Sequence, residues 1–401
     1  MPDSRPLTVL CLASDVKGHA FIRECHRLGC RVLVVTRQMH ADGDWPREAI
    51  AQMYFMPSLL RREDLLKGVS WLARREVIDR VVALDDFDVE QAALLREHLR
   101  VPGMGDTTAR YFRDKLAMRV RAQEEGILVP EFVHALNDAA IARFAKEVPL
   151  PWVLKPRSEG SAAGILKLWS ADELWQRLDE LGDQRSFHLI ERFVPGDVYH
   201  VDAIVSEMEV PFIVTSRYGK PPLDVMSGGG LFVTRTLPAD APDSRETASL
   251  TRQLVNALGL VRGVTHTEFI CSRDDGRFYF LETAARVGGA HIAEVVEAAT
   301  GVNLWVEWAR IEVGGGKAPY RAPTPRAESA GIVLSLARQE WPDTSRYDDP
   351  EIVCRMRRPN HAGLIVASRD SARVDALLDA YSRRFYEDFF ASGPGLARVE
   401  R

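Results

Sequence analysis

Apolar runs in the N-terminal part of the chain alternate with helical patterns and predict an open α/β unit. A mostly apolar run at residues 7–13 is followed by apolar residues at helical spacing up to Leu28, and a second apolar run covers residues 31–36. A strand, helix, strand order of this kind pairs its strands in parallel. A further strand and helix at residues 78–99 extend the pattern. We therefore expect a Rossmann-like α/β domain at residues 1–105.

The turn after the first predicted strand indicates what this domain does not bind. A nicotinamide dinucleotide site would need the pattern Gly-x-Gly-x-x-Gly there, because the backbone must approach the pyrophosphate closely. The turn contains only Gly18, so we do not expect a dinucleotide site.

The rest of the chain predicts two further parts. A proline and two glycines within residues 101–105 interrupt regular structure and mark a boundary. Residues 152–191 then follow the order strand, small-residue loop, strand, helix, strand, and more strands come after them. Three consecutive glycines at residues 314–316 act as a linker. The expected organisation is mixed α/β and α+β in three parts: residues 1–105; a central unit of residues 106–315, with a small lobe at 106–190 and a large lobe at 191–315; and a small C-terminal α+β module at 316–401.

The strongest chemical signal is a predicted hairpin that contains two glutamates. Strand-like alternation at residues 265–270 and 278–283 flanks Asp-Asp-Gly, a sequence typical of a hairpin turn. If the loop is centred on Asp275, Glu268 lies opposite Glu282, with β-carbons roughly 5 Å apart. Two carboxylates that close are destabilising unless one is protonated or a cation lies between them, and oxygen ligands favour magnesium. A two-residue turn would instead place one glutamate on the opposite face, as an ordinary surface charge.

Two lysines occupy positions that favour an anionic partner. Lys115 follows Asp114 at the start of a predicted helix, where the helix dipole disfavours a cation unless an anion is near. Lys155 ends a short apolar strand, where burying its charge costs on the order of several kcal/mol without a partner. The loop at residues 157–164 is rich in small residues and could bring backbone amides against phosphate oxygens. The alternative is an ordinary hairpin connection with solvated lysines.

Several other polar residues allow both a functional and a structural interpretation. Arg286 could neutralise a phosphate group or form an ion pair with Glu294 or Glu297. His266 could orient a phosphate or be a hydrogen-bonded strand histidine. Residues 216–236 are predicted to be a mobile loop, and three residues that precede its glycine run could bind an acid substrate or form a solvated loop edge: Arg217, Tyr218 and Lys220.

Composition narrows the class of protein. The net charge of -5 and the hydrophobic share of 46% are typical of a soluble globular protein and argue against a nucleic-acid partner held by a basic face. The odd number of cysteines, without Cys-x-x-Cys spacing, favours free thiols in a reducing compartment. We see neither a secretory signal nor an apolar stretch that could span a bilayer. We expect a cytoplasmic protein that does not bind membranes and has surface free for a homodimer.

The order of these motifs resembles the ATP-grasp superfamily, in its carboxylate-amine ligase branch, which includes L-amino-acid ligases and biotin-carboxylase-like enzymes. The resemblance covers roughly residues 5–390 and rests on motifs that occur in the right order. They are Val101-Pro102-Gly103 leading to Arg113-Asp114-Lys115, Gly126 to Pro130, Lys155-Pro156 with its small-residue loop, Glu191 to Asp197, and His266-Thr267-Glu268 with Glu282 and Arg286.

The resemblance implies an ATP-grasp fold and a role for each matched residue. Magnesium would be held by Glu268 and Glu282. Arg286 would be the catalytic residue, because a guanidinium beside a phosphate can stabilise an acyl-phosphate. Glu191 would accept a hydrogen bond from the adenine amino group, and Asp197 would contact the ribose. The residues implied to bind ATP are Lys115, Lys155, Ser158, Gly160, Ser161, Glu191, Phe193, Val194, Asp197 and His266.

The implied activity is an ATP- and magnesium-dependent ligation of a carboxylate to an amine through an acyl-phosphate, with small amino-acid or dipeptide-type substrates. Bicarbonate activation, as in the carboxylase and carbamoyl-phosphate branches, is an alternative. A second alternative is an ATP-binding module without turnover. It is suggested by Ala284, which stands where family members usually have a metal-binding asparagine.

Overall fold

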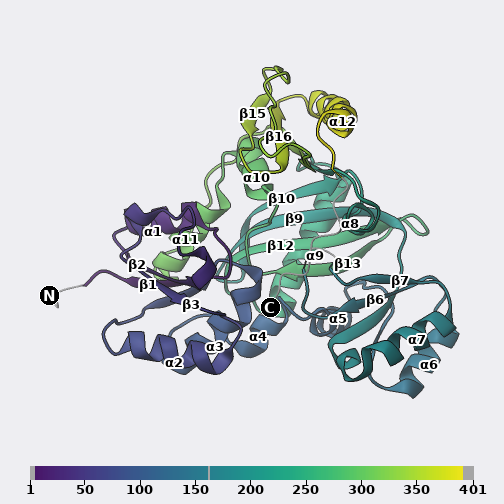
Figure 1. The fold of residues 1–401 in the computed structure, drawn as a ribbon, viewed down its shortest axis with the longest axis horizontal. Coiled ribbons are helices and arrows are strands. Elements are labelled where there is room, and N and C mark those ends of the chain that lie inside the picture. Colours follow the sequence, from purple (N-terminus) through teal and green to yellow (C-terminus); the bar gives the residue numbers. More distant parts are fainter. Residues whose placement is uncertain (1–4, 161–162, 392–401) are drawn as a thin grey trace.

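Three β-sheets organise the part of the chain that the computed structural model describes, residues 5–160 and 163–391 (Figure 1). The N-terminal sheet is parallel and has the strand order β3-β2-β1-β4. Its strands and the helices that cover it are β1 (Thr8–Ala13), α1 (His19–Arg27), β2 (Arg31–Arg37), β3 (Gln52–Met56), α2 (Arg62–Ala73), β4 (Arg80–Ala83) and α3 (Val89–Leu99).

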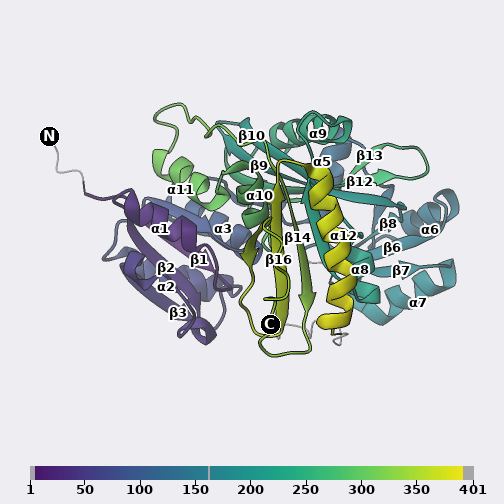
Figure 2. The same cartoon turned by 90° about the horizontal axis from the view of Figure 1, so that it is seen from above.

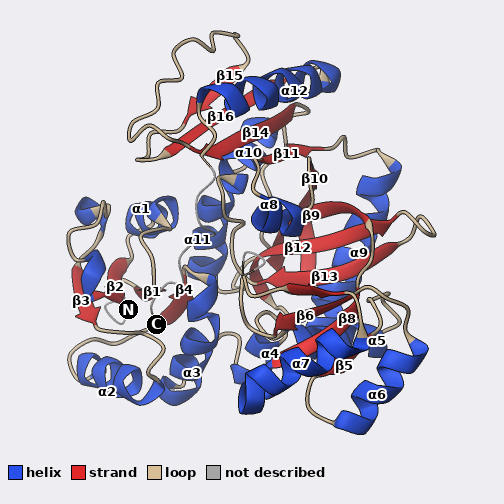
Figure 3. Cartoon of the chain, turned by 45° about the vertical axis from the view of Figure 1, so that its right-hand side comes forward, coloured by secondary structure: helices blue, strands red, loops and turns tan. Residues whose placement is uncertain are grey.

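Alternation along β1 explains why both faces of this sheet are covered. Val9 and Cys11 pack in the cluster that contains Phe21 of α1, whereas Leu10 and Leu12 pack in the cluster formed with α2 and α3. Figure 3 shows α1 on one side of the sheet and α2 and α3 on the other. The predicted βαβ arrangement is confirmed, because β1 and β2 pair in parallel and α1 lies between them in the chain. A parallel sheet that is apolar on both faces requires helices on both.

A small antiparallel sheet with the order β5-β8-β6-β7 follows. Alternate residues of β6, including Trp152 and Leu154, pack against Leu174 and Leu178 of α7. The elements of this region are α4 (Asp106–Arg110), α5 (Lys115–Glu124), β5 (Phe132–His134), α6 (Asp138–Glu147), β6 (Trp152–Pro156), β7 (Leu166–Leu168), α7 (Ala171–Leu181) and β8 (His188–Arg192).

The central sheet has the order β13-β12-β9-β10-β11-β14-β16-β15. One face packs against α9 and α5, and the other face contains the residues of the candidate site. In chain order, the elements that form the first part of this sheet, with the helices between and after them, are β9 (Gly196–Ser206), β10 (Glu209–Tyr218), α8 (Pro222–Gly228), β11 (Phe232–Thr236), α9 (Pro242–Leu258), β12 (Arg262–Ser272), β13 (Phe278–Ala284), α10 (Ile292–Thr300) and α11 (Leu304–Gly314).

The C-terminal strands continue this sheet, because β14 pairs with β11. Figure 2 shows α12 lying along β14 and β16, where its apolar side covers them. The boundary at residue 315 therefore stays a prediction, since strands on both sides of it share one sheet. These elements are β14 (Ser329–Leu336), β15 (Ile352–Arg355), β16 (His361–Ser368) and α12 (Ser371–Asp388).

Helix α11, which follows the strands of the central sheet, packs against α1 of the N-terminal domain. Trp308 is buried, and its ring centroid lies 5.1 Å from that of Phe21 in α1. Short 3-10 turns complete the described chain at Gln38–His40, Arg47–Ala49, Asp86–Asp88 and Gly182–Phe187. None of the helices in this part of the chain combines the length and the hydropathy that crossing a membrane requires.

The predicted mobile loop within residues 216–236 is wrong. The segment contains the helix α8 and the strand β11 as well as the end of β10. Pro222 stands at the start of α8, where its missing N–H costs no hydrogen bond. The glycines that suggested a loop instead end this helix, since Gly229 has a φ of 69°.

Candidate functional site

The two hairpin glutamates face one another, as the sequence predicts: Glu268 of β12 is paired with Glu282 of β13. The reason differs from the expected one. The connection at residues 273–276 sets a register that, if continued, would place Glu268 opposite Leu281. A β-bulge at Leu281 adds one residue to β13 and corrects the register. The bulge, and not the loop length alone, puts both carboxylates on one face.

Lys115 extends from α5 to this carboxylate pair. Its Nζ lies 2.9 Å from Oε2 of Glu282, and it also donates to the carbonyl of Glu159. Burial raises the pKa of the Glu282 carboxyl, but Lys115, together with Lys155 and Arg119, outweighs this effect and holds that pKa below its ordinary value. Asp114 caps the helix, because its carboxylate accepts from the backbone N–H of Leu116. The anion expected near the helix start is therefore Glu282, one of the two glutamates that form the candidate metal-binding pair (Glu268 and Glu282, hereafter the candidate metal pair).

Lys155 is paired with Glu191, which lies on the neighbouring strand β8. Its Nζ is 2.5 Å from Oε2 of that glutamate. Burial lowers the pKa of Lys155 to about 8, although Glu191 raises it. This carboxylate is the partner that burial of the lysine requires. The proposed contacts of Lys155 with phosphate and of Glu191 with adenine stay predictions.

Arg119 is a residue of this cluster that the sequence analysis missed. Its side chain is completely buried, and its Nε lies 2.6 Å from Oε1 of Glu191. Val120, the next residue of α5, is exposed, whereas Lys115 and Arg119 are buried. The sequence did contain a signal for Arg119, because it follows Lys115 by four positions and residues four apart share one helix face. Lys115 and Arg119 therefore approach the site from the same side.

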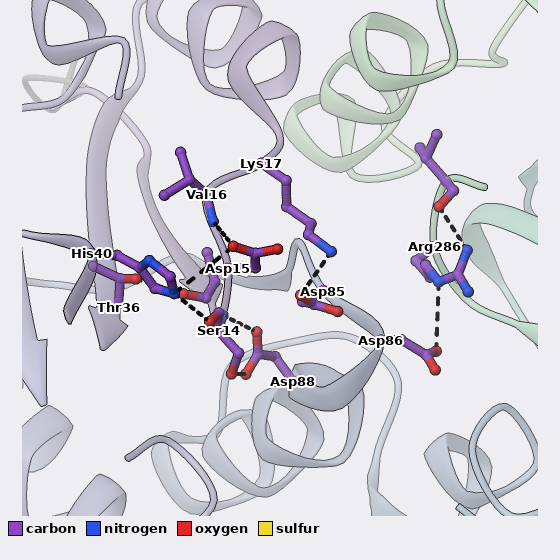
Figure 4. Close-up of polar contacts among 12 residues, drawn as sticks. Ser14, Asp15, Val16, Lys17, Thr36, His40, Asp85, Asp86, Asp88 and Arg286 are labelled. Atoms are coloured by element: carbon purple, nitrogen blue, oxygen red, sulfur yellow. Dashed lines mark hydrogen bonds and ion pairs between the residues drawn. The ribbon is translucent and has the colours of Figure 1, made fainter. Parts of the chain in front are cut away.

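Arg286 contacts the N-terminal domain (Figure 4). Its Nε lies 3.7 Å from Oδ1 of Asp86, and its Nη1 donates to the carbonyl of Val287 at 3.0 Å. The predicted alternative partners are wrong, because Glu294 lies near His291 and Glu297 accepts from Asn303. The alternative failed because Asp86 is remote in sequence and only the fold brings it to Arg286.

Arg113 is a second arginine that forms an ion pair with Asp86, and it also donates to the carbonyl of Ser158. An added Cβ at Gly160 would lie 3.8 Å from Oδ2 of Asp86. The small-residue loop is thus next to Asp86 and Lys115, as far as it is described. Ser161, also predicted to bind phosphate, lies outside the described residues.

His266 lies between two carboxylates. Its Nδ1 donates to Oδ1 of Asp202 at 2.9 Å, and its Nε2 is 3.5 Å from Oε1 of Glu268. Burial lowers the pKa of His266, but Asp202 and Glu268 outweigh it and raise the pKa to about 9. The histidine is therefore hydrogen-bonded within the sheet and adjacent to Glu268, whereas its role in orienting a phosphate stays a prediction.

The remaining candidates lie in the connection between β8 and β9 and, in the case of Asp197, at the start of β9. Nζ of Lys167 lies 3.5 Å from the ring centroid of Phe193, and Val194 is 4% exposed. Asp197 forms ion pairs with Arg217 and with Arg273. Its predicted role as a ribose partner is untested by these contacts.

The three residues considered for an acid substrate differ in their surroundings and do not contact a common group. Arg217 pairs with Asp197, whereas Tyr218 donates to Oε1 of Glu268 at 2.8 Å. Lys220 is exposed in the turn after β10. Of these three, Tyr218 is the one that contacts the candidate metal pair.

Comparisons with known proteins found related sequences and folds, although no family model matches the chain. The L-arginine-specific L-amino acid ligase of Bacillus subtilis is 26% identical over 252 residues, which are 61% of this chain and 59% of that protein. The D-alanine--D-alanine ligase of Thermotoga maritima is 28% identical over 267 residues, covering 59% of this chain and 82% of the relative. The aligned part of the chain spans less than two thirds of the Bacillus subtilis ligase.

A solved structure extends the similarity to nearly the whole chain. The L-amino acid ligase of Bacillus licheniformis superposes with a TM-score of 0.77 at 19% identity, covering 96% of this chain and 98% of that one. At this identity the match establishes a common fold.

Proposed function

We propose, from the premise that this chain belongs to the ATP-grasp superfamily, that it is an ATP- and magnesium-dependent ligase that joins a carboxylate to an amine. The observation that supports this most directly is the pairing of Glu268 with Glu282, with Lys115 beside them. Amino-acid or dipeptide-type substrates are proposed because the relatives are named as amino-acid ligases.

The residues present fit ATP and magnesium. Carboxylate oxygens on one face of a hairpin suit a hard divalent cation, so Glu268 and Glu282 would hold it. Lys115 and Lys155 each pair with a carboxylate in this structure, and phosphate oxygens would compete for the same cations. When bound, magnesium-ATP supplies the phosphoryl group that activates the substrate carboxylate. Arg286 would neutralise charge on that activated group.

The carboxyl edge of the N-terminal sheet is the proposed place for the substrates. Ligands of open parallel sheets bind where the strand order reverses, and here that point lies between β1 and β4. Figure 4 shows Lys17 and Asp85 at this edge, 2.7 Å apart. Asp86, next in sequence, faces Arg286. An edge with both charge signs suits substrates that contain an amine and a carboxylate.

Release of ADP and phosphate from magnesium-ATP, measured with pooled amino acids and other small carboxylates, tests the function. Release that requires both a pool and Glu282 supports the ligase, with Glu282→Ala as the control. Bicarbonate forms a separate pool, since release with bicarbonate alone would support the carboxylase-type alternative. ATP binding without release from any pool would contradict turnover on these substrate classes.

Ala284 allows a direct test of the binding-only alternative. It is paired with His266 and lies on the same face as Glu282, so an asparagine there would add a ligand oxygen toward the metal pair. We expect Ala284→Asn to raise magnesium affinity by roughly 10-fold, which is the lower end of the effect that single groups around a metal site have on its affinity. The measurements are the Mn²⁺ affinity in the presence of ADP, which needs no turnover, and ADP release in the variant and the wild type. An unchanged affinity would show that the alanine does not limit metal binding.

A homodimer and a cytoplasmic location are also proposed, from the sequence alone. Light scattering coupled to size-exclusion chromatography would measure the oligomeric state directly.

A further inference from the structure

A buried row of polar side chains lies behind Glu268 on the same face of the central sheet. Strand β9 presents His200 and Asp202 to this face, and β12 presents His266 and Glu268. In the ladder, Asp202 pairs with His266, and His200 pairs with Glu268. His200 and Asp202 are fully buried. Polar groups in such positions cost free energy unless they are hydrogen-bonded, so their contacts need a physical explanation.

Asp202 determines the orientation of both imidazole rings. Its Oδ2 accepts from Nδ1 of His200 at 2.7 Å, and its Oδ1 accepts from Nδ1 of His266 at 2.9 Å. Because both rings direct Nδ1 to this carboxylate, their Nε2 atoms point away from it. Nε2 of His200 lies 2.7 Å from Oγ1 of Thr234, and Nε2 of His266 lies 3.5 Å from Oε1 of Glu268. The carboxylate therefore directs one ring toward the candidate metal ligand.

These three side chains could themselves be considered as a metal site. Ligand atoms of His200, Asp202 and His266 lie within 4.8 Å of one another. The Nδ1 atoms and the carboxylate oxygens are, however, already used in hydrogen bonds between these residues. The geometry thus favours a supporting hydrogen-bond network over a separate metal centre.

The loop after β13 packs directly on the same pair. A Cβ added at Gly288 would lie 3.0 Å from Oδ1 of Asp202 and 3.0 Å from Nδ1 of His266. Glycine permits this approach because it has no side chain to displace either group. Arg286 precedes Gly288 by two positions in this loop. Asp202 and His266 therefore support the loop of the candidate catalytic arginine as well as the Glu268 side chain.

We propose that Asp202 is a positioning residue of the metal and phosphate site: it orients Glu268 through His266 and supports the Arg286 loop through the contact at Gly288. Tyr218 donates to the same Oε1 atom of Glu268 at 2.8 Å, so this oxygen is held from two sides. The inference rests on the proposed function, in which Glu268 binds magnesium. Groups that orient metal ligands typically change metal affinity by roughly 10- to 100-fold.

The Asp202→Asn variant of the full chain tests this role. An asparagine keeps the shape of the aspartate side chain, but only its amide oxygen can accept a hydrogen bond, because its NH₂ group donates. The ring whose Nδ1–H would face that NH₂ group must therefore turn or change its tautomer. Binding of Mn²⁺ in the presence of ADP, measured by electron paramagnetic resonance, is expected to weaken by roughly 10- to 100-fold. Saturating magnesium is expected to restore most of the ADP release. A merely structural defect would instead lower the melting temperature and the metal-free affinity for ADP, and added magnesium would not restore release.

Two further variants keep the test decisive. Thr283→Val is the matched control, because Thr283 bonds Thr267 at 2.8 Å on the opposite face of the same ladder, and its Mn²⁺ affinity should equal that of the wild type. Gly288→Ala keeps every polar group but crowds Asp202 and His266, as well as Ile292. It should therefore also weaken Mn²⁺ binding, and it decides the question if Asp202→Asn does not fold. Wild-type Mn²⁺ affinity in either folded variant overturns the proposal. A wild-type chain that binds no Mn²⁺ with ADP overturns the proposed metal site as well.

Discussion

Replacing Glu282 by glutamine is expected to lower magnesium-dependent ADP release by roughly 10³-fold, which corresponds to about 4 kcal/mol of transition-state stabilisation. Glu282 faces Glu268 across the ladder and pairs with Lys115 at 2.9 Å. The amide keeps the size of the side chain but removes the charge that a divalent cation requires. It also leaves Lys115 without its carboxylate partner. The rate should fall even when ATP is saturating, since the loss concerns the charge near the phosphates.

The control for this prediction is Glu209→Gln, which removes an equal charge from an exposed position at the start of β10. The comparison uses single-turnover ADP release, Mn²⁺ binding and metal-free ADP binding. We expect metal-free ADP binding to be retained in Glu282→Gln, because the glutamine still fits between the strands. Normal Mn²⁺ binding and turnover in Glu282→Gln would contradict the assignment of this residue to the metal.

Replacing Arg286 by lysine is expected to reduce kcat by roughly 10²- to 10³-fold, with a smaller change in the KM for ATP. Lysine keeps the positive charge but lacks the planar fork that contacts two oxygens at once. Arg286 is partly exposed and lies 3.7 Å from Asp86. A weak ion pair at this distance contributes little to stability, so the melting temperature should hardly change.

The matched control for Arg286 is Arg277→Lys, an exposed arginine in the connection between β12 and β13. Steady-state kinetics with the substrate found in the pool assay would separate kcat from KM. If Arg286→Lys kept wild-type kcat but lost thermal stability, the arginine would serve only to join the N-terminal domain to the central sheet.

The predictions that succeeded depend on short stretches of sequence. The parallel βαβ unit follows from the alternation of apolar runs and a helical pattern, and both faces of its sheet are apolar and covered. The hairpin that contains Glu268 and Glu282 follows from two alternating strands and a turn, although a bulge that the sequence did not indicate sets their pairing. The need of Lys155 for an anion follows from its place at the end of an apolar strand, and Glu191 fills that need. Local periodicity and the cost of burying charge are enough for these conclusions.

Two of the failures depend on contacts between distant segments, and a third depends on glycines whose role is locally ambiguous. Asp86 and Arg286 are separated by about half of the chain, so no local pattern could indicate that they form an ion pair. The helix α8 was missed because glycines that end a helix resemble the glycines of a loop. Arg119 was missed because a buried arginine is recognised only when its partner, here Glu191, is known.

The sequence by itself determined the type of each main strand and helix in the candidate site, and the residue types that can hold a divalent cation and phosphates. Only the tertiary structure decided how these groups are oriented. The bulge at Leu281 sets the two glutamates face to face, and Asp202, on a different strand, orients the histidine behind them. The physical reason is that periodicity acts within one element, whereas register, burial and ion pairing are set by segments that meet only when the chain folds.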